Sequence, residues 1–230
     1  MNQYRINDIR HLISSRGLLH PLDVALVGAT GVGKSSTING LFGDEVAKVG
    51  TGTDPETQEV AQYRINDVFR VHDSAGFGEG KEADTRHAHN LSDLLLQTCR
   101  TQTPQEHSYG LIDLALVILD GSSRDMGTTY KLLEQVVLQC LEPSRVVVAI
   151  NQADMAMKGR YWNHSKKRPE AELQRFLEDK SHSIQNRLYE ATGIRIPAPI
   201  YYSAATGYNL DQLMNHIIQA IPQQRRLSAA

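Results

Sequence analysis

Residues 22–41 read LDVALVGATGVGKSSTINGL, an apolar run followed by a glycine-rich turn and a helix-forming segment. Residues 28–35 fit the pattern G-x-x-x-x-G-K-[ST], in which glycines let backbone N–H groups converge on a polyphosphate at the start of a helix. Lys34 is suited to neutralise the β- and γ-phosphates, and the Ser35 hydroxyl to coordinate Mg²⁺. An accidental strand-turn-helix corner is the alternative, but the flanking strand and helix favour a phosphate-binding loop.

The composition is that of one soluble α/β domain. The chain has 230 residues, enough for one full hydrophobic core, and its 24 Lys and Arg against 26 Asp and Glu give no general electrostatic case for nucleic-acid or membrane binding. Cys99 and Cys140 lack metal-ligand or redox spacing, which is typical of reduced thiols. Because no signal peptide or membrane-length apolar run is found, we expect a cytoplasmic protein with no transmembrane segment.

Strand and helix patterns alternate along the rest of the chain. Apolar spacing at Ile6, Ile9, Leu12 and Ile13 predicts a leading helix. Further expected elements are an antiparallel hairpin at 60–66 and 68–73, strands at 114–119, 146–150 and 199–203, and helices at 130–140, 171–191 and 210–221. This order predicts a doubly wound α/β sheet whose ligands bind beyond the carboxyl ends of the strands. The expected divisions are a helical extension (1–20), one domain (21–222) and a disordered tail (223–230).

Three shorter motifs follow expected strands on that same rim. After the second hairpin strand, the Asp73 carboxylate can reach Mg²⁺ through water and the Gly76 N–H can meet a γ-phosphate, although a plain strand-ending turn has the same composition. Asp154, in Asn151-Gln-Ala-Asp, can accept two hydrogen bonds from the N1 and N2 donors of guanine, a pair that adenine lacks. Ser203-Ala204-Ala205 can offer a backbone N–H to the guanine O6. Each motif is weak alone, and their order and placement make coincidence improbable.

With these four motifs the chain resembles the GTPase superfamily over residues 20–221, and within it the branch of Era, septin and chloroplast-import GTPases, to which small predicted bacterial GTPases belong. The ending Thr206-Gly-Tyr-Asn-Leu-Asp-Gln-Leu213 is similar to Era. The resemblance implies a GTPase (G) domain with a mixed six-stranded sheet, one strand of it antiparallel, flanked by helices on both faces. It also implies GTP or GDP and Mg²⁺ as ligands.

The resemblance assigns roles to individual residues. Lys34, Thr57 and Gly76 would be catalytic, and Ser35, Thr57 and Asp73 would hold the metal. Thr57 is chosen as the switch-I threonine because it precedes the hairpin and follows Asp54-Pro55, with Thr53 as the second choice. The nucleotide would contact Gly28, Thr30, Gly31, Val32, Gly33, Lys34, Ser35, Ser36, Asn151, Asp154, Ser203 and Ala204.

Three positions depart from the family pattern. Phe77 replaces the glutamine that orients water in many GTPases, and Gly31 replaces the asparagine through which some Era-branch members bind potassium. Turnover without help is therefore expected to be slow, between about 10⁻⁴ and 10⁻² per second. Gln152 replaces the usual lysine of NKxD, which weakens affinity but leaves guanine preference to Asp154.

These features suggest a nucleotide-dependent molecular switch, with a septin-like GTP-dependent dimerisation module of little hydrolysis as the alternative. A homodimer is one partner that this implies, and a ribosome or RNA partner is suggested by the family. The stretch 155–170 combines five basic residues with Tyr161 and Trp162, which could stack on RNA bases. We favour an ordinary surface insertion with a packed tryptophan.

Overall fold

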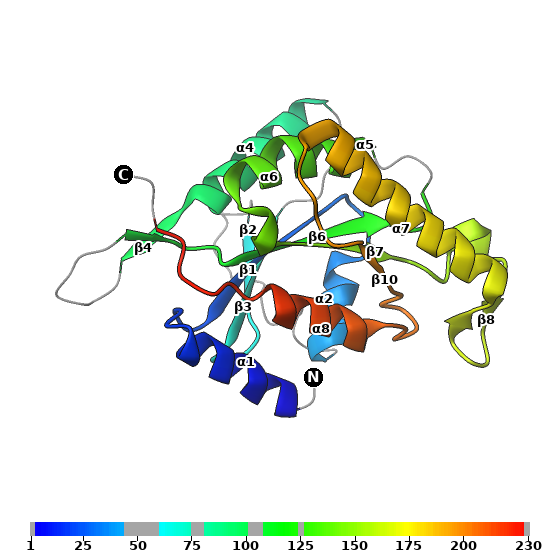
Figure 1. Cartoon of the computed structure of the whole chain (residues 1–230), viewed down its shortest axis with the longest axis horizontal. Helices are drawn as coiled ribbons and strands as arrows, with labels where there is room; N and C mark the ends of the chain where they lie inside the picture. The colour runs from blue at the N-terminus through cyan, green and yellow to red at the C-terminus, as the bar shows by residue number, and fades with distance from the viewer. Residues whose placement is uncertain (1–2, 44–59, 75–80, 101–107, 124–126, 228–230) are drawn as a thin grey trace.

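A central sheet with strand order β10-β7-β6-β1-β3-β2 organises the computed structural model, which describes residues 3–43, 60–74, 81–100, 108–123 and 127–227 (Figure 1). Strand β2 runs antiparallel to β3 and the other pairs are parallel. The predicted doubly wound sheet with one antiparallel strand is therefore confirmed. The strands are β1 (Leu22–Gly28), β2 (Val60–Arg64), β3 (Phe69–Ser74), β6 (Leu114–Asp120), β7 (Val146–Asn151) and β10 (Ile200–Tyr201).

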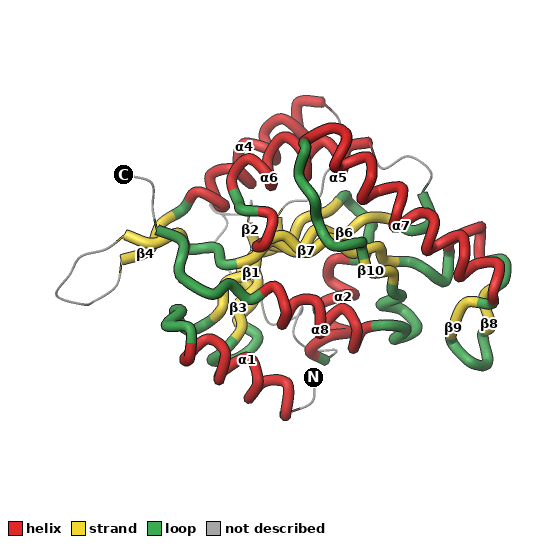
Figure 2. Tube along the Cα trace, in the orientation of Figure 1, coloured by secondary structure: helices red, strands yellow, loops and turns green. Residues whose placement is uncertain are grey.

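Helices cover both faces of the sheet, as Figures 1 and 2 show. Successive residues of β1 alternate between two cores, with Val24 and Leu26 on one face and Ala25 and Val27 on the other. Every residue of β1 is buried, which explains its continuous apolar sequence. The first face carries α1 (Gln3–Ser15), α2 (Lys34–Phe42) and α8 (Leu210–Ala220), and the second carries α4 (Lys81–Leu96), α5 (Gly127–Leu132), α6 (Leu138–Cys140) and α7 (Ala171–Thr192).

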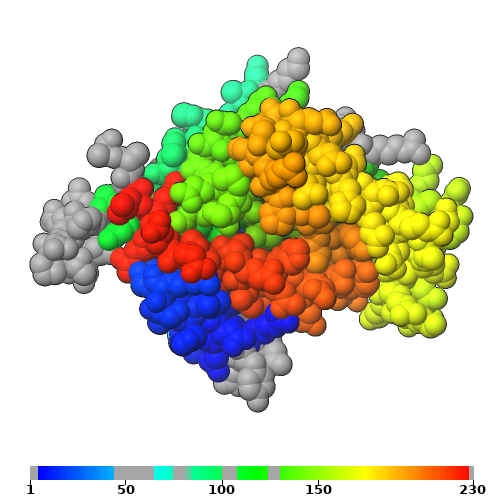
Figure 3. All heavy atoms as spheres, in the orientation of Figure 1, coloured from blue at the N-terminus to red at the C-terminus, as the bar shows by residue number. Residues whose placement is uncertain are grey.

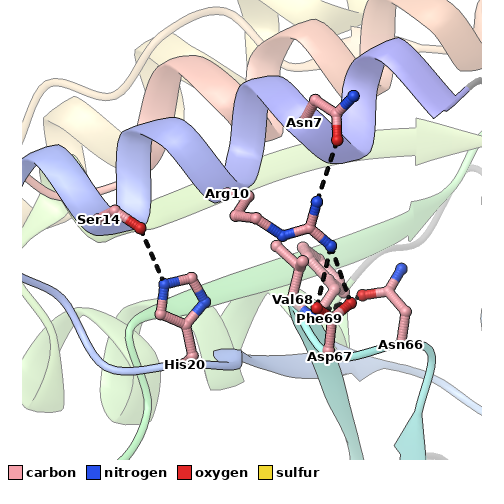
Figure 4. Close-up of polar contacts among 8 residues, drawn as sticks. All are labelled: Asn7, Arg10, Ser14, His20, Asn66, Asp67, Val68 and Phe69. Carbon is pink, nitrogen blue, oxygen red and sulfur yellow. Dashed lines mark hydrogen bonds and ion pairs between the residues drawn. The ribbon is translucent and has the colours of Figure 1, made fainter.

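Helix α1 packs into the same core as the sheet. Ile9 and Ile13 are fully buried, as the helical spacing predicts. On its outer side, Arg10 donates two hydrogen bonds to the carboxylate of Asp67, at 3.1 and 2.9 Å (Figure 4). Asp67 lies at the turn between β2 and β3, where the Asn66 side chain accepts hydrogen bonds from the next backbone N–H groups. The leading helix is therefore joined to the tip of the predicted hairpin.

Several elements were not predicted from the sequence. Residues 130–140 form a helix interrupted by a π-helical stretch at Leu133–Val137, and the last strand is two residues long, although Tyr202 continues its hydrogen bonding to Ile150 and Ala153. Two small hairpins lie outside the main sheet: β4 (Thr98–Arg100) with β5 (Ser108–Gly110), and β8 (Trp162–Asn163) with β9 (Arg168–Pro169). Short 3₁₀ turns occur at Pro143–Arg145 and Ala156–Gly159.

Residues 223–227 differ from the disordered tail that their polar sequence predicts. Gly110 donates to the carbonyl of Arg226 at 2.8 Å, and Arg145 donates to that of Gln224 at 2.8 Å. The Arg226 side chain in turn donates to the carbonyl oxygens of Cys140 and Leu95. Arginine-to-carbonyl bonds thus fix a segment with few apolar residues, and residues 228–230 lie outside the described ranges.

No helix within the described ranges combines the length and apolar character needed to cross a membrane.

Candidate functional site

The predicted phosphate-binding loop connects β1 to α2 in a backbone conformation that requires glycine. Gly31 and Gly33 have φ angles of 78° and 90°, in the left-handed region. A Cβ at Gly33 would also lie 2.4 Å from the side-chain nitrogen of Asn151. The Lys34 ammonium group donates to the carbonyl oxygens of Gly28 (3.0 Å) and Ala29 (3.3 Å), so its charge lies within the loop. The loop therefore has the shape and the cation that a polyphosphate requires.

Asn151, the last residue of β7, joins three loops. Its side chain is 3% exposed and donates to the carbonyl of Val32 at 2.9 Å, while its oxygen accepts from the N–H of Ala204 at 3.0 Å. The neighbouring Gln152 side chain donates to the carbonyl of Gly31 at 3.0 Å. The phosphate loop, the NQAD turn and the SAA turn are thus held together by side-chain hydrogen bonds.

A second link joins α2 to the end of the last strand. The Thr37 hydroxyl donates to the Gly33 carbonyl at 2.8 Å and lies 2.7 Å from the hydroxyl of Tyr202. Because the single Thr37 hydroxyl hydrogen is used at Gly33, Tyr202 is the donor of this second bond. Tyr202 is fully buried, and burial raises the pKa of its phenol. Neither residue was predicted as a site residue, because no sequence pattern reveals a contact across 165 positions.

Asp73 and Ser35 fit a magnesium ion. Asp73 lies near the carboxyl end of β3, and its buried Oδ1 atom has no hydrogen-bond partner among the described residues. Burial raises the pKa of Asp73 to about 6, an effect that the nearby charge of Lys34 opposes. A buried carboxylate oxygen without a partner is costly unless a cation or donor satisfies it. Ser35 is exposed at the start of α2, where its hydroxyl can supply a second oxygen ligand.

No cluster of three His, Cys, Asp or Glu side chains suited to a metal occurs in the parts of the chain that the structure covers. This fits Mg²⁺ bound by one or two protein oxygens together with phosphates and water, rather than an all-protein metal cage.

The base-binding residues lie at the same rim. Asp154 is half-buried, and its carboxylate has no printed partner to displace within the described residues. Ser203 is fully buried, and its hydroxyl accepts from the N–H of Thr206 at 3.2 Å, which stabilises the turn. The Ala204 N–H, which was expected to be available for the nucleotide, is donated instead to Asn151.

The structure brings most of the predicted site residues together. Those at the carboxyl ends of β1, β3, β7 and β10 are Gly28, Thr30, Gly31, Val32, Gly33, Lys34, Ser35, Ser36, Asp73, Asn151, Asp154, Ser203 and Ala204. The predictions for Thr57 and its second choice Thr53, for Gly76 and for the departure at Phe77 lie outside the described residues.

Residues after β6 were missed as parts of the rim. Gly121 donates its N–H to the Asn151 carbonyl at 2.8 Å, and a Cβ at this position would lie 2.4 Å from that oxygen. The Lys180 ammonium group donates to the carbonyls of Asp120, Gly121 and Ser123. A glycine directly after an apolar strand was the available sequence clue to this close approach.

Trp162 belongs to the core of the insertion. It is 6% exposed, contacts Tyr208 edge-on with ring centroids 5.5 Å apart, and packs with Leu173 and Leu177. Tyr161 is 47% exposed. Of the two aromatic residues in this basic loop, one is therefore unavailable for stacking on a ligand.

Comparisons with known proteins agree with this geometry. Residues 23–152 match the family described as 50S ribosome-binding GTPase. A tRNA modification GTPase MnmE of Sulfurovum sp. (strain NBC37-1) is 31% identical over 146 residues, which cover 62% of this chain and 29% of that protein. The matched region thus spans less than a third of the length of this curated relative.

Solved structures share the fold. A probable GTP-binding protein engB has a TM-score of 0.52 at 20% identity, covering 86% of this chain and 98% of that one. A GTP-binding protein from Sulfolobus solfataricus in complex with GDP has a TM-score of 0.52 at 19% identity, covering 95% and 58%. At these identities the likeness concerns the fold alone. The family match extends over more than half of the chain and includes the phosphate loop and Asn151, so this protein belongs to the family of 50S ribosome-binding GTPases.

Proposed function

We propose that this protein binds GTP with Mg²⁺, hydrolyses it slowly to GDP and phosphate, and acts as a nucleotide-dependent molecular switch. The observation that carries the proposal is the position of Asn151, which ties the phosphate loop at Val32 to the base-edge turn at Ala204. One side chain thereby fixes the distance between the phosphate-binding and base-binding halves of the pocket.

Asp154 is proposed to select guanine. It lies three residues after Asn151, and a carboxylate there can accept the paired N1 and N2 hydrogens of the base. Adenine leaves such a carboxylate unpaired, which is a strong basis for discrimination. The Gln152 amide donates to Gly31, so this residue also stabilises the phosphate loop although it lacks the positive charge of a lysine.

Magnesium is proposed to bind at Ser35 and Asp73, with Thr57 as the switch-I ligand. Bound Mg²⁺ would neutralise phosphate charge, and Lys34 would contribute its own charge to the β- and γ-phosphates. Ordering of switch I around Thr57 and contact of the Gly76 N–H with the γ-phosphate are the proposed switching events. Since Phe77 and Gly31 provide neither of the usual aids to water attack, turnover is proposed to be slow.

Nucleotide selectivity of an Asp154→Asn variant tests this function. An asparagine presents a donor and an acceptor in place of two acceptors, so the variant should lose affinity for GTP and gain affinity for XTP. The affinities of GTP, ATP and XTP are measured for the native chain and the variant. Asp211→Asn, a change at an exposed carboxylate on α8, is the matched control. Equal native affinities for GTP and ATP, or an Asp154 variant with unchanged preference, would contradict the proposal.

The alternative, an assembly module with little hydrolysis, shares the same pocket and rests on the same Phe77 and Gly31. Phosphate release at low protein concentration supports the switch enzyme. Negligible release together with dimerisation that depends on GTP, measured by light scattering, supports the assembly module.

A further inference from the structure

A hollow of about 650 Å³ lies at the end of the sheet opposite the nucleotide pocket. It is lined by four arginines (Arg16, Arg145, Arg225 and Arg226) together with Tyr109 and Glu142. Arg145 immediately precedes β7, whereas Asn151 at the far end of the same strand contacts the phosphate loop, so the two sites are separated by the length of the strand. Figure 3 shows the C-terminal segment in red between blue residues of the N-terminal region and green residues.

The terminal nitrogens of two of these arginines already have partners. Arg145 is 3% exposed and donates to the carbonyls of Asp113 (3.3 Å) and Gln224 (2.8 Å), and Arg226 donates to those of Cys140 and Leu95. Arg16 likewise donates to the carbonyl of Ile221. These bonds fix the guanidinium groups in place around the hollow.

The Nε–H groups are different. The buried Nε atoms of Arg145, Arg225 and Arg226 have no hydrogen-bond acceptor among the residues that the structure describes. Arg145 Nε has only an ion pair with the Glu142 carboxylate at 3.8 Å, beyond hydrogen-bond distance. A buried N–H donor without an acceptor is costly, and three such donors around one hollow point to an acceptor that the protein itself does not supply.

The charge of the hollow is not balanced either. Four arginines are opposed in the lining by Glu142, whose side chain is 72% exposed and therefore strongly hydrated. Burial and the nearby charge of Arg145 lower the pKa of Arg226. The buried carboxyl of Asp113, behind the hollow, has its pKa raised to about 7 by burial, so its negative charge is incomplete at neutral pH. An anion in the hollow would relieve this repulsion.

We propose that this hollow binds a small phosphate-bearing molecule whose phosphate oxygens accept hydrogen bonds from the Nε–H groups of Arg145, Arg225 and Arg226. A phosphate group offers three acceptor oxygens to the three donors, whereas a carboxylate offers two. The Arg225 guanidinium lies 5.0 Å from the ring centroid of Tyr109, which holds its plane in position. The volume suits a ligand of the size of a mononucleotide or a sugar phosphate.

Inorganic phosphate is the probe for the test. The full chain is saturated with GDP and Mg²⁺ so that its phosphate loop is filled, and phosphate or chloride is titrated at constant ionic strength while the arginine Nε–H resonances are followed by NMR. We expect saturable shifts of the resonances of Arg145, Arg225 and Arg226 with phosphate and none with chloride. The same titration of a Lys34→Ala variant without nucleotide is expected to give the same shifts, so the result does not depend on GTP binding.

Arg225→Gln is expected to weaken phosphate binding about tenfold, because it removes one charge-assisted hydrogen bond. Arg195→Gln is the matched control, since Arg195 also lies over a tyrosine, 4.4 Å from the ring centroid of Tyr189, but does not line the hollow. Arg225→Lys, which keeps the charge, replaces the glutamine variant should that one unfold at a lower temperature than the control. Shifts that do not saturate, that appear equally with chloride, or that persist unchanged in the Arg225 variants would overturn the proposal.

Discussion

The side-chain nitrogen of Asn151 donates a hydrogen bond to the Val32 carbonyl at 2.9 Å, and the oxygen of the same amide accepts one from Ala204. Only an amide can perform both roles, because a carboxylate has no hydrogen to donate and a hydroxyl is too short to reach both loops. The hydrogen bonds therefore explain why the residue before the specificity motif is an asparagine in terms of the phosphate loop as well as of the base.

Asn151→Asp should separate these two roles. The aspartate can still accept from Ala204 but places a charged oxygen against the Val32 carbonyl, which leaves a buried acceptor unsatisfied. We expect the free energy of unfolding to fall by about 1–3 kcal/mol and GTP affinity to fall at least about tenfold. Chemical denaturation and nucleotide titration measure the two effects.

Asn163→Asp is the control for the same chemical change. The Asn163 oxygen accepts hydrogen bonds from Ser165 and from the N–H of Lys166, roles that a carboxylate keeps. We expect this variant to bind GTP as the native chain does. An Asn151→Asp variant with native affinity would show that the Val32 contact is not needed for binding.

The contrast between β1 and residues 223–227 shows what the sequence could predict. β1 is buried on both faces, so its composition alone identifies it, and the glycine pattern after it predicts the phosphate loop. Residues 223–227 are polar, and nothing local predicts that Gly110 and Arg145 hydrogen-bond to their backbone. Local pattern thus predicted the layers and the rim, whereas side-chain bonds between distant segments required the structure.

The short hairpins illustrate a second reason. β8 has two residues, and its position depends on the buried Trp162 packing against Leu173 and Tyr208 rather than on strand periodicity. A pattern of period two cannot be detected over two residues. The interpretation of this stretch as an insertion with a packed tryptophan was nevertheless available from composition, since one large aromatic in a polar segment is usually buried.

Magnesium binding should depend on pH through Asp73. The raised pKa of about 6 means that, without metal, this carboxyl becomes protonated as the pH falls below about 6 and must lose that proton to bind Mg²⁺. We expect the Mg²⁺ concentration needed for tight GTP binding to increase between pH 7.5 and pH 5.5. An Asp73→Asn variant should need more Mg²⁺ at both pH values and show a smaller change between them. Titration of Mg²⁺ at fixed GTP measures this, and equal pH dependence in both proteins would rule out Asp73 as the titrating ligand.

The stability of the protein should carry the signature of Asp113. Burial raises its pKa from 3.8 to about 7, so the native state retains a proton that the unfolded state loses as the pH rises from about 4 to 7. The unfolded state then binds fewer protons, and the contribution of this group to the free energy of unfolding decreases over that window. Asp113→Asn keeps an acceptor for the N–H of Asp23 and removes the titration.

We therefore expect the Asp113→Asn variant to become more stable relative to the native chain as the pH rises from 4 to 8, by up to about 4 kcal/mol at the linkage value of about 1.4 kcal/mol per pKa unit. Urea unfolding at several pH values measures the difference. Asp8→Asn, at an exposed position on α1, is the control and should change little. A constant difference between the Asp113 variant and the native chain across this range would contradict the raised pKa.

Helix α1 should be held mainly by its buried side. Ile13 is fully buried in the core shared with β1 and β3, so Ile13→Ala should lower the free energy of unfolding by about 2–5 kcal/mol. Arg10→Ala removes the hydrogen bonds to Asp67 in Figure 4, but both side chains of that ion pair are largely in water, 44% and 65% exposed. Exposed ion pairs gain little because solvent screens the charges and two long side chains lose freedom. Denaturant unfolding of both variants should therefore show a large loss for Ile13→Ala and a much smaller one for Arg10→Ala, and the reverse order would mean that the hairpin contact, rather than the core, anchors the helix.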